Sequence, residues 1–441
     1  MSETRRELAD QPGVGTRQTF LAALASALGW ALDLYDLILI LYVAPAVGRA
    51  FFPTTRPTLS LAAVYATFAV TLLMRPVGSA IFGSYADRHG RKVTLYRTIV
   101  GVGIVTALLG ALPTIDQVGL LAPALFTILR LAQGIFVGGV MVCTGTIGVE
   151  TVPERWRGLM SGLIGGGAGG IGGLIASGVF WIVSSAFPGD LFLVWGWRCM
   201  FFSGIMSSIL GIVLVRRLEE SPLWTRLQAG RAARSGPARA PLRRLFSRQH
   251  RGVFLVNLLL TTGGGAGYYL TTGFLPTLLK VVNGLDSAVA SAILVGAATA
   301  SFVAAVTTGH LSQIFGRKRM FVVLGLLRLV ILPGFCLLMA RSADPGNVAA
   351  YGIVLCFLGS ASYAPLLVFL NERFPTAVRA SGVGLSWNIG FSIGGALPAL
   401  VSFVAPSTAD LPSVLAATLL ATAVLYLAGA VIVPETRGRM A

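Results

Sequence analysis

The stretch GSYADRHGRK, residues 83–92, occurs again 226 residues later as GHLSQIFGRK, residues 309–318. Two weaker matches follow the same order along the chain: ETVPERWRG (150–158) with ERFPTAVRA (372–380), and EESP (219–222) with PETRG (434–438). Three matched positions are hard to explain by coincidence. The sequence therefore predicts two related halves, each about half of the 441-residue chain.

Long apolar segments separate these polar motifs. Hydrophobic residues make up 55% of the chain and charged residues only 12%, with a mean hydropathy of +0.79. A bilayer core needs roughly 20 apolar residues per helix, and the sequence contains twelve such segments. The expected spans are 20–46, 59–82, 94–112, 119–143, 158–186, 193–215, 252–279, 286–309, 319–340, 347–370, 379–404 and 411–433.

The fold class predicted from these segments is all-α: a polytopic membrane protein with 12 transmembrane helices in two pseudo-symmetric six-helix bundles. The first apolar segment is too long and too acidic for the core of a signal peptide, so we expect it to stay as a helix. Parallel halves of this kind are typical of transporters that rock around a site near the bilayer midplane. The expected parts are an N-terminal tail (1–19), a first bundle (20–215), a central loop (216–251), a second bundle (252–433) and a C-terminal tail (434–441).

The net charge of +17 lies mainly in alternate loops. A nucleic-acid partner would require this charge on a folded soluble surface, so we expect none. By the positive-inside rule the basic loops and both termini are cytoplasmic. A high ratio of Arg to Lys with abundant Ala and Gly points to a bacterial plasma (inner) membrane. The basic loops hold Arg88, Arg91, Lys92, Arg97, Arg155, Arg157, the stretch 216–251, Arg317, Lys318, Arg319, Arg373 and Arg379.

Several classes of chemistry have no support in the sequence. There is no G-x-x-x-x-G-K-[ST] loop for an ATP-driven pump, and no nucleophile with a base for an enzyme. The histidines lack metal-ligand spacing, and the cysteines lack paired spacing. We therefore expect no catalytic site, no metal and no cofactor. These residues are His89, His250, His310, Cys143, Cys199, Cys336 and Cys356.

The repeated motif resembles the signature of the major facilitator superfamily between helices 2 and 3, and RLAQGIFVGG (130–139) resembles its fourth-helix motif. The resemblance covers the whole chain. Three segments are similar to the metabolite:proton symporters and to the neighbouring lactate and sialic acid permeases, whose substrates are mostly organic anions. These segments are DLYD (33–36), MRPVGSAIFGSYADRHGRK (74–92) and YYLTTGFLPTLLK (268–280).

The signature loops provide glycines for close packing and tight turns, and charges for ion pairs at the cytoplasmic surface. The resemblance implies a gating network that holds the halves in one state; the alternative is that these charges only set the topology. In the second copy Gln313 replaces the aspartate, so we expect a weaker latch there. The expected network consists of Gly83, Asp87, Arg88, Gly90, Arg91, Glu150, Arg157, Arg317, Glu372 and Arg379.

Four charged residues lie at membrane depth, where charge is costly and by default functional. Asp33 and Asp36 lie about 20 and 24 Å along the first helix, Arg75 about 12 Å along the second and Arg130 about 16 Å along the fourth. Burial favours protonation of a carboxylate and a nearby arginine opposes it, so movement of the arginine can load or unload a proton. We expect Asp36, Asp33 and Arg130 to couple transport to protons, with Asp36 as the preferred site. The alternative is a static ion pair.

A substrate carboxylate needs a cation, and an arginine can hold it with two hydrogen bonds. Arg75 and Arg130 are the best placed; the alternative for either one is that it is committed to an aspartate. Arg328, also deep, is expected to have a structural or snorkelling role. The expected substrate-binding residues are Arg75, Arg130, Gln133, Tyr268, Tyr269, Thr272 and Asn388.

Together these features predict a secondary transporter that moves a small organic anion, a mono- or dicarboxylate, together with protons. A facilitator, an exchanger or a symporter for zwitterions such as betaine or proline are alternatives within the same superfamily. A membrane receptor or enzyme on this scaffold is a more remote alternative. The expected partners are the small-molecule substrate, protons and the lipid bilayer.

Overall fold

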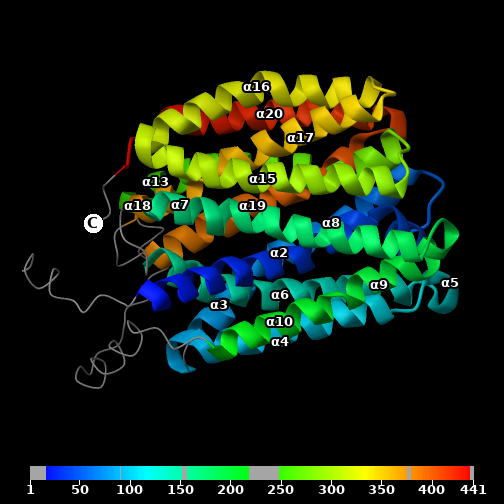
Figure 1. Cartoon of the computed structure of the whole chain (residues 1–441), viewed down its shortest axis with the longest axis horizontal. Helices are drawn as coiled ribbons and strands as arrows, with labels where there is room; N and C mark the ends of the chain where they lie inside the picture. The colour runs from blue at the N-terminus through cyan, green and yellow to red at the C-terminus, as the bar shows by residue number, and fades with distance from the viewer. Residues whose placement is uncertain (1–15, 90, 151–155, 218–247, 375–378, 438–441) are drawn as a thin grey trace, which may run out of the picture.

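A computed structural model describes residues 16–89, 91–150, 156–217, 248–374 and 379–437 (Figure 1). Within these ranges the chain is helical and contains no strand. Twelve of its helical segments are long and apolar enough to span a membrane, which confirms the predicted number. The predicted ends are off by a few residues; the first span, for example, continues to Phe51 rather than 46.

The first half contains six spans and eleven helical elements; one of these, α5, lies between the third and fourth spans. The fifth and sixth spans each include a π-helical segment, which the sequence pattern did not predict. The elements are α2 (Thr16–Phe51), α3 (Pro57–His89), α4 (Arg91–Ala111), α5 (Ile115–Val118), α6 (Leu121–Glu150), α7 (Arg157–Ser161), η2 (Gly162–Gly167), α8 (Ala168–Ala186), η3 (Phe192–Gly196), α9 (Trp197–Phe202) and α10 (Gly204–Arg217).

The second half also contains six spans. Its first span is the most irregular, because two π-helical segments, η4 and η5, interrupt it. The elements are α13 (Arg248–Tyr268), η4 (Tyr269–Gly273), α14 (Leu275–Thr277), η5 (Leu278–Val282), α15 (Ser287–Phe315), α16 (Arg317–Arg341), α17 (Pro345–Tyr363), α18 (Leu366–Arg373), α19 (Arg379–Val404), η6 (Thr408–Asp410) and α20 (Leu411–Ile432).

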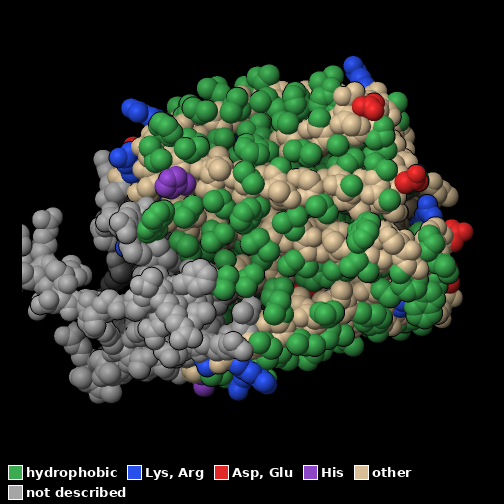
Figure 2. Space-filling view, viewed as in Figure 1, with side chains coloured by type: hydrophobic (Ala, Val, Ile, Leu, Met, Phe, Trp, Pro, Cys, Tyr) green, Lys and Arg blue, Asp and Glu red, His purple; other side chains and the backbone are tan. Residues whose placement is uncertain are grey.

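The long helices run side by side along one axis (Figure 1). Hydrophobic side chains cover the visible flank, whereas Lys, Arg, Asp and Glu gather at the two ends of the bundle (Figure 2). This surface is that of a multi-pass membrane protein. We call the end at which α2 begins and the described C-terminus lies the terminal end, and the other the opposite end.

The two halves pack against each other along α3 with α19 and along α8 with α15. Glycines make the second contact possible. A Cβ atom at Gly162 would lie 2.5 Å from the carbonyl oxygen of Ala305, and one at Gly170 would lie 2.6 Å from the backbone nitrogen of Phe302. This glycine-rich span therefore packs backbone to backbone against α15.

Candidate functional site

Four charged side chains lie at similar depth inside the first half. Asp33 and Asp36 lie on α2, Arg75 on α3 and Arg130 on α6, and none is more than 7% exposed. Charges buried at this depth need partners or a function. We call these four residues the charged layer.

Two glycines fix the positions of both arginines. A Cβ atom at Gly134 or Gly138 of α6 would lie 2.2 Å from a backbone oxygen of α3, that of Thr71 or Arg75 respectively. The hydroxyl of Ser79 also donates a hydrogen bond to the carbonyl of Gly138, at 2.9 Å. These glycines belong to the RLAQGIFVGG motif, and their four-residue spacing was the sequence signal for this close approach.

Asp33 forms an ion pair with Arg75. Arg75 Nη2 lies 3.4 Å from Asp33 Oδ2, while Asp33 Oδ1 and Arg75 Nε have no hydrogen-bond partner in the described part of the chain. Tyr269, on η4 of the second half, interacts electrostatically with both residues. Helix α3, which carries Arg75, packs against α19 of the second half, so the pair lies close to the contact between the halves.

Asp36 turns away from that interface. Its Oδ2 accepts a hydrogen bond from Ser207 of α10 at 2.6 Å, and a Cβ atom at Gly204 would lie 2.8 Å from its Oδ1. Three residues along a helix correspond to a rotation of about 300°, which is enough to give two neighbouring carboxylates different surroundings. Asp33 and Asp36 therefore have different partners, although they lie within one turn of α2.

Arg130 has no ion pair with a described carboxylate. Its Nη1 donates to Oε1 of Gln133, whose Nε2 donates to Thr106 of α4 at 2.8 Å. The guanidinium lies 5.9 Å from the ring centroid of Phe68, and its Nε and Nη2 are buried with no described hydrogen-bond partner. Because two of its donors are unused, Arg130 is the better equipped of the two arginines to bind an anion.

Aromatic side chains cover the second half opposite the charged layer. Tyr269 packs edge-on against Phe68 at 5.3 Å, and Trp387 against Trp30 of α2 at 6.0 Å. The rings of Trp387 and Phe391 are stacked 4.3 Å apart. We call the second-half members the aromatic wall: Tyr268 and Tyr269 at the junction of α13 and η4, Tyr363 of α17, and Trp387 and Phe391 of α19.

The other expected substrate residues lie in or near this wall. Tyr268 Oη and Asn388 Oδ1 are buried and have no hydrogen-bond partner in the described ranges, so both are available to a ligand. Thr272 lies beside Cys356. Sequence reasoning missed Trp30, Trp387 and Phe391 because aromatic residues within apolar helices look like ordinary core residues.

Contacts between the halves lie on both sides of the charged layer. Toward the opposite end, Tyr65 hydrogen-bonds to Thr277 at 2.7 Å and stacks on Phe274 at 5.2 Å. Toward the terminal end, the hydroxyl of Ser161 donates to the carbonyl of Ala364 at 3.0 Å. These contacts join the two halves on both sides of the charged layer.

The expected gating network is described mainly in the second half. Arg317 forms a bidentate ion pair with Glu372, at 3.1 and 3.2 Å, and Glu372 also accepts a hydrogen bond from Thr436. Gly83 lies within α3, and Arg157 begins α7 with a half-buried side chain. Gly90 and the side chains of Asp87, Arg88, Arg91, Glu150 and Arg379 lie outside the described residues.

A segment after the last helix binds the terminal end of the second half. Glu435 accepts hydrogen bonds from the backbone amides of Arg317 and Lys318 at the start of α16, at 2.9 and 3.1 Å. Partial burial disfavours its charged form, but these amides and those of Thr436 and Arg437 outweigh that effect and lower the pKa of Glu435. Glu435 therefore acts as an anionic cap of α16.

Replacing Glu435 by Gln is expected to lower the apparent Tm at pH 7 by roughly 1–2 °C, since the cap keeps its shape and loses its charge. A carboxylate whose pKa is depressed by folding stabilises the protein above its unfolded pKa, and this contribution disappears as pH falls through the folded value. The difference in Tm should therefore shrink as the pH falls below about 4.3. Thermal unfolding in detergent measures it, with exposed Asp190→Asn as control; a difference that does not change with pH would contradict the charged cap.

Arg328 is fully buried, so the snorkelling role expected for it is wrong. Its Nη2 donates to the carbonyl of Gly263 at 2.7 Å, and its guanidinium lies 4.5 Å from the ring centroid of Tyr426. These contacts join α16, α13 and α20 within the second half. The structural role expected as the alternative agrees with them.

Known proteins resemble the chain over nearly its whole length. It is 30% identical to the proline/betaine transporter of Escherichia coli K12, over 95% of this chain and 84% of that protein. It is 29% identical to the glycine betaine/proline/ectoine/pipecolic acid transporter OusA of Dickeya dadantii, over 88% of this chain and 78% of that protein.

Solved structures show the same fold. The partially occluded inward-open form of the xylose transporter XylE from E. coli matches with a TM-score of 0.76 at 18% identity, covering 96% of this chain and 99% of that one. The family model of the Major Facilitator Superfamily matches residues 19–399. The chain is a membrane transporter, and it belongs to the major facilitator superfamily.

Proposed function

We propose that this transporter is a proton-coupled symporter of a small solute that carries a carboxylate. The observation that carries the proposal is the ion pair of Asp33 and Arg75, buried at membrane depth on helices of the first half, one of which, α3, packs against α19 of the second half. An ion pair with only a structural role can lie anywhere in the bundle. An ion pair that breaks and reforms during transport must lie close to the contact between the two halves, because that contact opens.

The coupling follows from charge. When Asp33 is ionised it neutralises Arg75, and the empty site can change its exposure from one side to the other. A proton on Asp33 removes that neutralisation, so Arg75 and Arg130 together attract the carboxylate of a substrate. Proton and substrate then bind together, and loss of either one favours release of the other.

Orientation follows from the distribution of basic residues. Arg317, Lys318 and Arg373 lie at the terminal end, where α10 also ends at Arg217 and α13 begins at Arg248. By the positive-inside rule we place the terminal end in the cytoplasm and the protein in the bacterial inner membrane. A proton gradient directed inward would then drive accumulation in the cell.

A zwitterion with an alkylated ammonium group is the substrate class that the site supports best. Aromatic faces bind quaternary ammonium groups through cation–π attraction, and the aromatic wall lies opposite the arginines that would hold the carboxylate. The relatives are named as transporters of proline and betaine, and both compounds carry a carboxylate and an alkylated ammonium group.

An organic anion is the second candidate. It is favoured by Arg130, which has two unused donors and no described carboxylate partner. Gln133 and Asn388 would supply neutral hydrogen bonds to such a substrate. This class requires no positive group, so the aromatic wall would serve only to exclude water.

A pair of substrates with the same shape separates the two classes. Glycine betaine and 3,3-dimethylbutyrate differ only in a quaternary nitrogen replaced by carbon. We expect proteoliposomes to accumulate radiolabelled glycine betaine, and 3,3-dimethylbutyrate to compete about tenfold more weakly or worse, since an aromatic contact to a desolvated cation contributes about 2 kcal/mol. Equal competition would contradict the zwitterion class and favour the anion. Failure of both compounds, and of a panel of carboxylates, to bind would contradict the proposal as a whole.

A further inference from the structure

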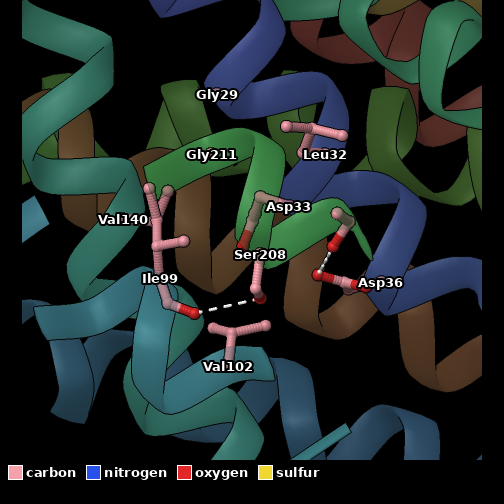
Figure 3. A pocket seen from close by; sticks show the side chains of 10 residues that line it. Gly29, Leu32, Asp33, Asp36, Ile99, Val102, Val140, Ser208 and Gly211 are labelled. Carbon is pink, nitrogen blue, oxygen red and sulfur yellow. Dashed lines mark hydrogen bonds between the residues drawn. The ribbon is translucent and has the colours of Figure 1, made fainter. Parts of the chain in front are cut away.

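A crevice opens beside the two aspartates, inside the first half (Figure 3). Its cavity volume is about 20 Å³, which is room for about one water molecule. Aliphatic side chains of α4 and α6 form part of its walls, and no described residue of the second half lines it. Its remaining lining includes Gly29, Asp33 and Asp36 of α2 and Ser207, Ser208 and Gly211 of α10.

The crevice extends from Asp36 toward the terminal end. Gly29 precedes Asp36 by seven residues, which places it about 10 Å nearer to the terminal end. On α10, Gly204 lies at the level of Asp36, and Gly211 lies about 10 Å beyond it in the same direction. The crevice therefore extends from the charged layer toward the terminal end, within the first half.

Its polar atoms can hold water. Oδ1 of Asp33 and Oδ1 of Asp36 are buried without a described hydrogen-bond partner, although both residues line the crevice. Ser207 donates to Asp36, and Ser208 donates to the carbonyl of Ile99 at 3.2 Å, so its oxygen remains free to accept. A buried water typically needs two to four such partners, and these oxygens provide them.

The surrounding charges favour a cation in this space. Arg75 of α3 pairs with Asp33, Arg130 of α6 bonds to Gln133, and Tyr269 approaches from η4. In the described parts of α4 and α10, the groups near Asp36 are hydroxyls rather than cations, namely those of Thr106, Ser203, Ser207 and Ser208. Asp36 thus has no described cation partner, and a proton entering the crevice would remove its uncompensated charge.

We propose that this crevice is the passage through which the transported proton leaves Asp33 and Asp36 toward the terminal end, separate from the path of the substrate. The inference rests on the proposed proton coupling. Asp33 is the junction of the two paths, since it lines the crevice and also pairs with Arg75 of α3, the helix that packs against α19 of the second half. Asp36, hydrogen-bonded within the first half, passes the proton along.

Filling the crevice tests the proposal. Gly211→Val and Gly29→Ala add methyl groups where the nearest side-chain atoms would lie 3.0 Å (Ile99) and 3.3 Å (Thr144) from the added Cβ atom. Gly178→Val is the matched control, because a Cβ atom there has no neighbour within 4 Å. Two rates are compared in proteoliposomes: accumulation driven by a pH gradient, and exchange of labelled for unlabelled substrate. Exchange needs no net proton movement.

We expect both filled variants to slow gradient-driven accumulation about tenfold, which corresponds to a barrier about 1.4 kcal/mol higher. Exchange should stay near the wild-type rate. The Gly178 variant should change neither rate. Equal slowing of both rates, or no slowing of either, in the filled variants would overturn the separate passage. Accumulation driven by a sodium gradient and slowed by the same variants would assign the crevice to sodium and overturn the proton.

Failure of the proposed function looks different from failure of this inference. If wild-type protein shows exchange but no response to a pH gradient, proton coupling itself is absent, and the passage falls with it. If wild-type protein is coupled and the filled variants remain fully coupled, only the passage is wrong.

Discussion

Replacing Asp33 by Asn is expected to abolish accumulation driven by a pH gradient while exchange of labelled substrate continues. Asn keeps the shape of the side chain but cannot bind or release a proton. The variant resembles the protonated state, in which Arg75 has lost its only described carboxylate partner. Substrate should therefore bind and cross the membrane, but only down its own concentration gradient. Uptake by proteoliposomes with and without an imposed pH gradient measures the difference.

Two other acids complete this experiment, one as a control and one as a second test. Asp190→Asn, at an exposed position on the opposite end, should keep full accumulation. Asp36→Asn should reduce gradient-driven accumulation and leave exchange unchanged, because its hydrogen bond lies within the first half. Full gradient-driven accumulation in both the Asp33 and the Asp36 variants would show that neither carboxylate carries the proton.

The second large effect is expected at Arg130. Arg130→Gln should raise the apparent KM for the substrate about 10- to 100-fold, since a buried hydrogen bond to a charged group contributes about 1.5–3 kcal/mol. Arg130→Lys should recover only part of the affinity, because a lysine lacks the planar pair of donors. Initial rates of uptake over a range of substrate concentrations give these values.

Arg328 provides a matched control, as a second fully buried arginine at membrane depth whose contacts lie within the second half. Arg328→Gln should lower the apparent Tm in detergent, because the carbonyl of Gly263 and the ring of Tyr426 lose a partner. The KM of the folded protein should stay near the wild-type value. A similar rise in KM for both variants would indicate a general effect of losing a buried charge rather than a substrate clamp at Arg130.

Much of the fold follows from the sequence by simple physics. Every helix that crosses a bilayer must be long and apolar, so hydropathy alone locates the twelve spans. The repeated loop motif predicts the pairing of the halves. The π-helical segments and the extension of the first span to Phe51 were not predicted, because they depend on packing between helices rather than on hydropathy.

The charged layer was only partly predictable. Depth along each helix identified Asp33, Asp36, Arg75 and Arg130, since a charge in an apolar segment is conspicuous. Their partners depend on the rotation of each helix and on the glycine contacts between α6 and α3, which one sequence does not specify. Sequence reasoning therefore preferred Asp36 for the proton, whereas the contact with Arg75 leads us to propose Asp33 as the coupling residue and Asp36 as its relay.

The aromatic wall was the larger omission. Tyr268 and Tyr269 were expected at the site because they belong to a family motif, but Trp387 and Phe391 carry no such signal. Only their stacking at 4.3 Å and the contact of Trp387 with Trp30 place them across from the charged layer. Under the proposed function, recognition of an ammonium group would be a property of this assembled surface and of no single residue.

The most direct test of proton coupling is the pH of the medium during uptake. Wild-type proteoliposomes are placed in weakly buffered medium without an imposed gradient, and substrate is added outside while the external pH is recorded. We predict that the medium becomes more alkaline as substrate enters, in proportion to the amount taken up, and that Asp33→Asn abolishes this change. Substrate entry with no change in external pH would mean facilitation or electroneutral exchange, and would contradict proton symport.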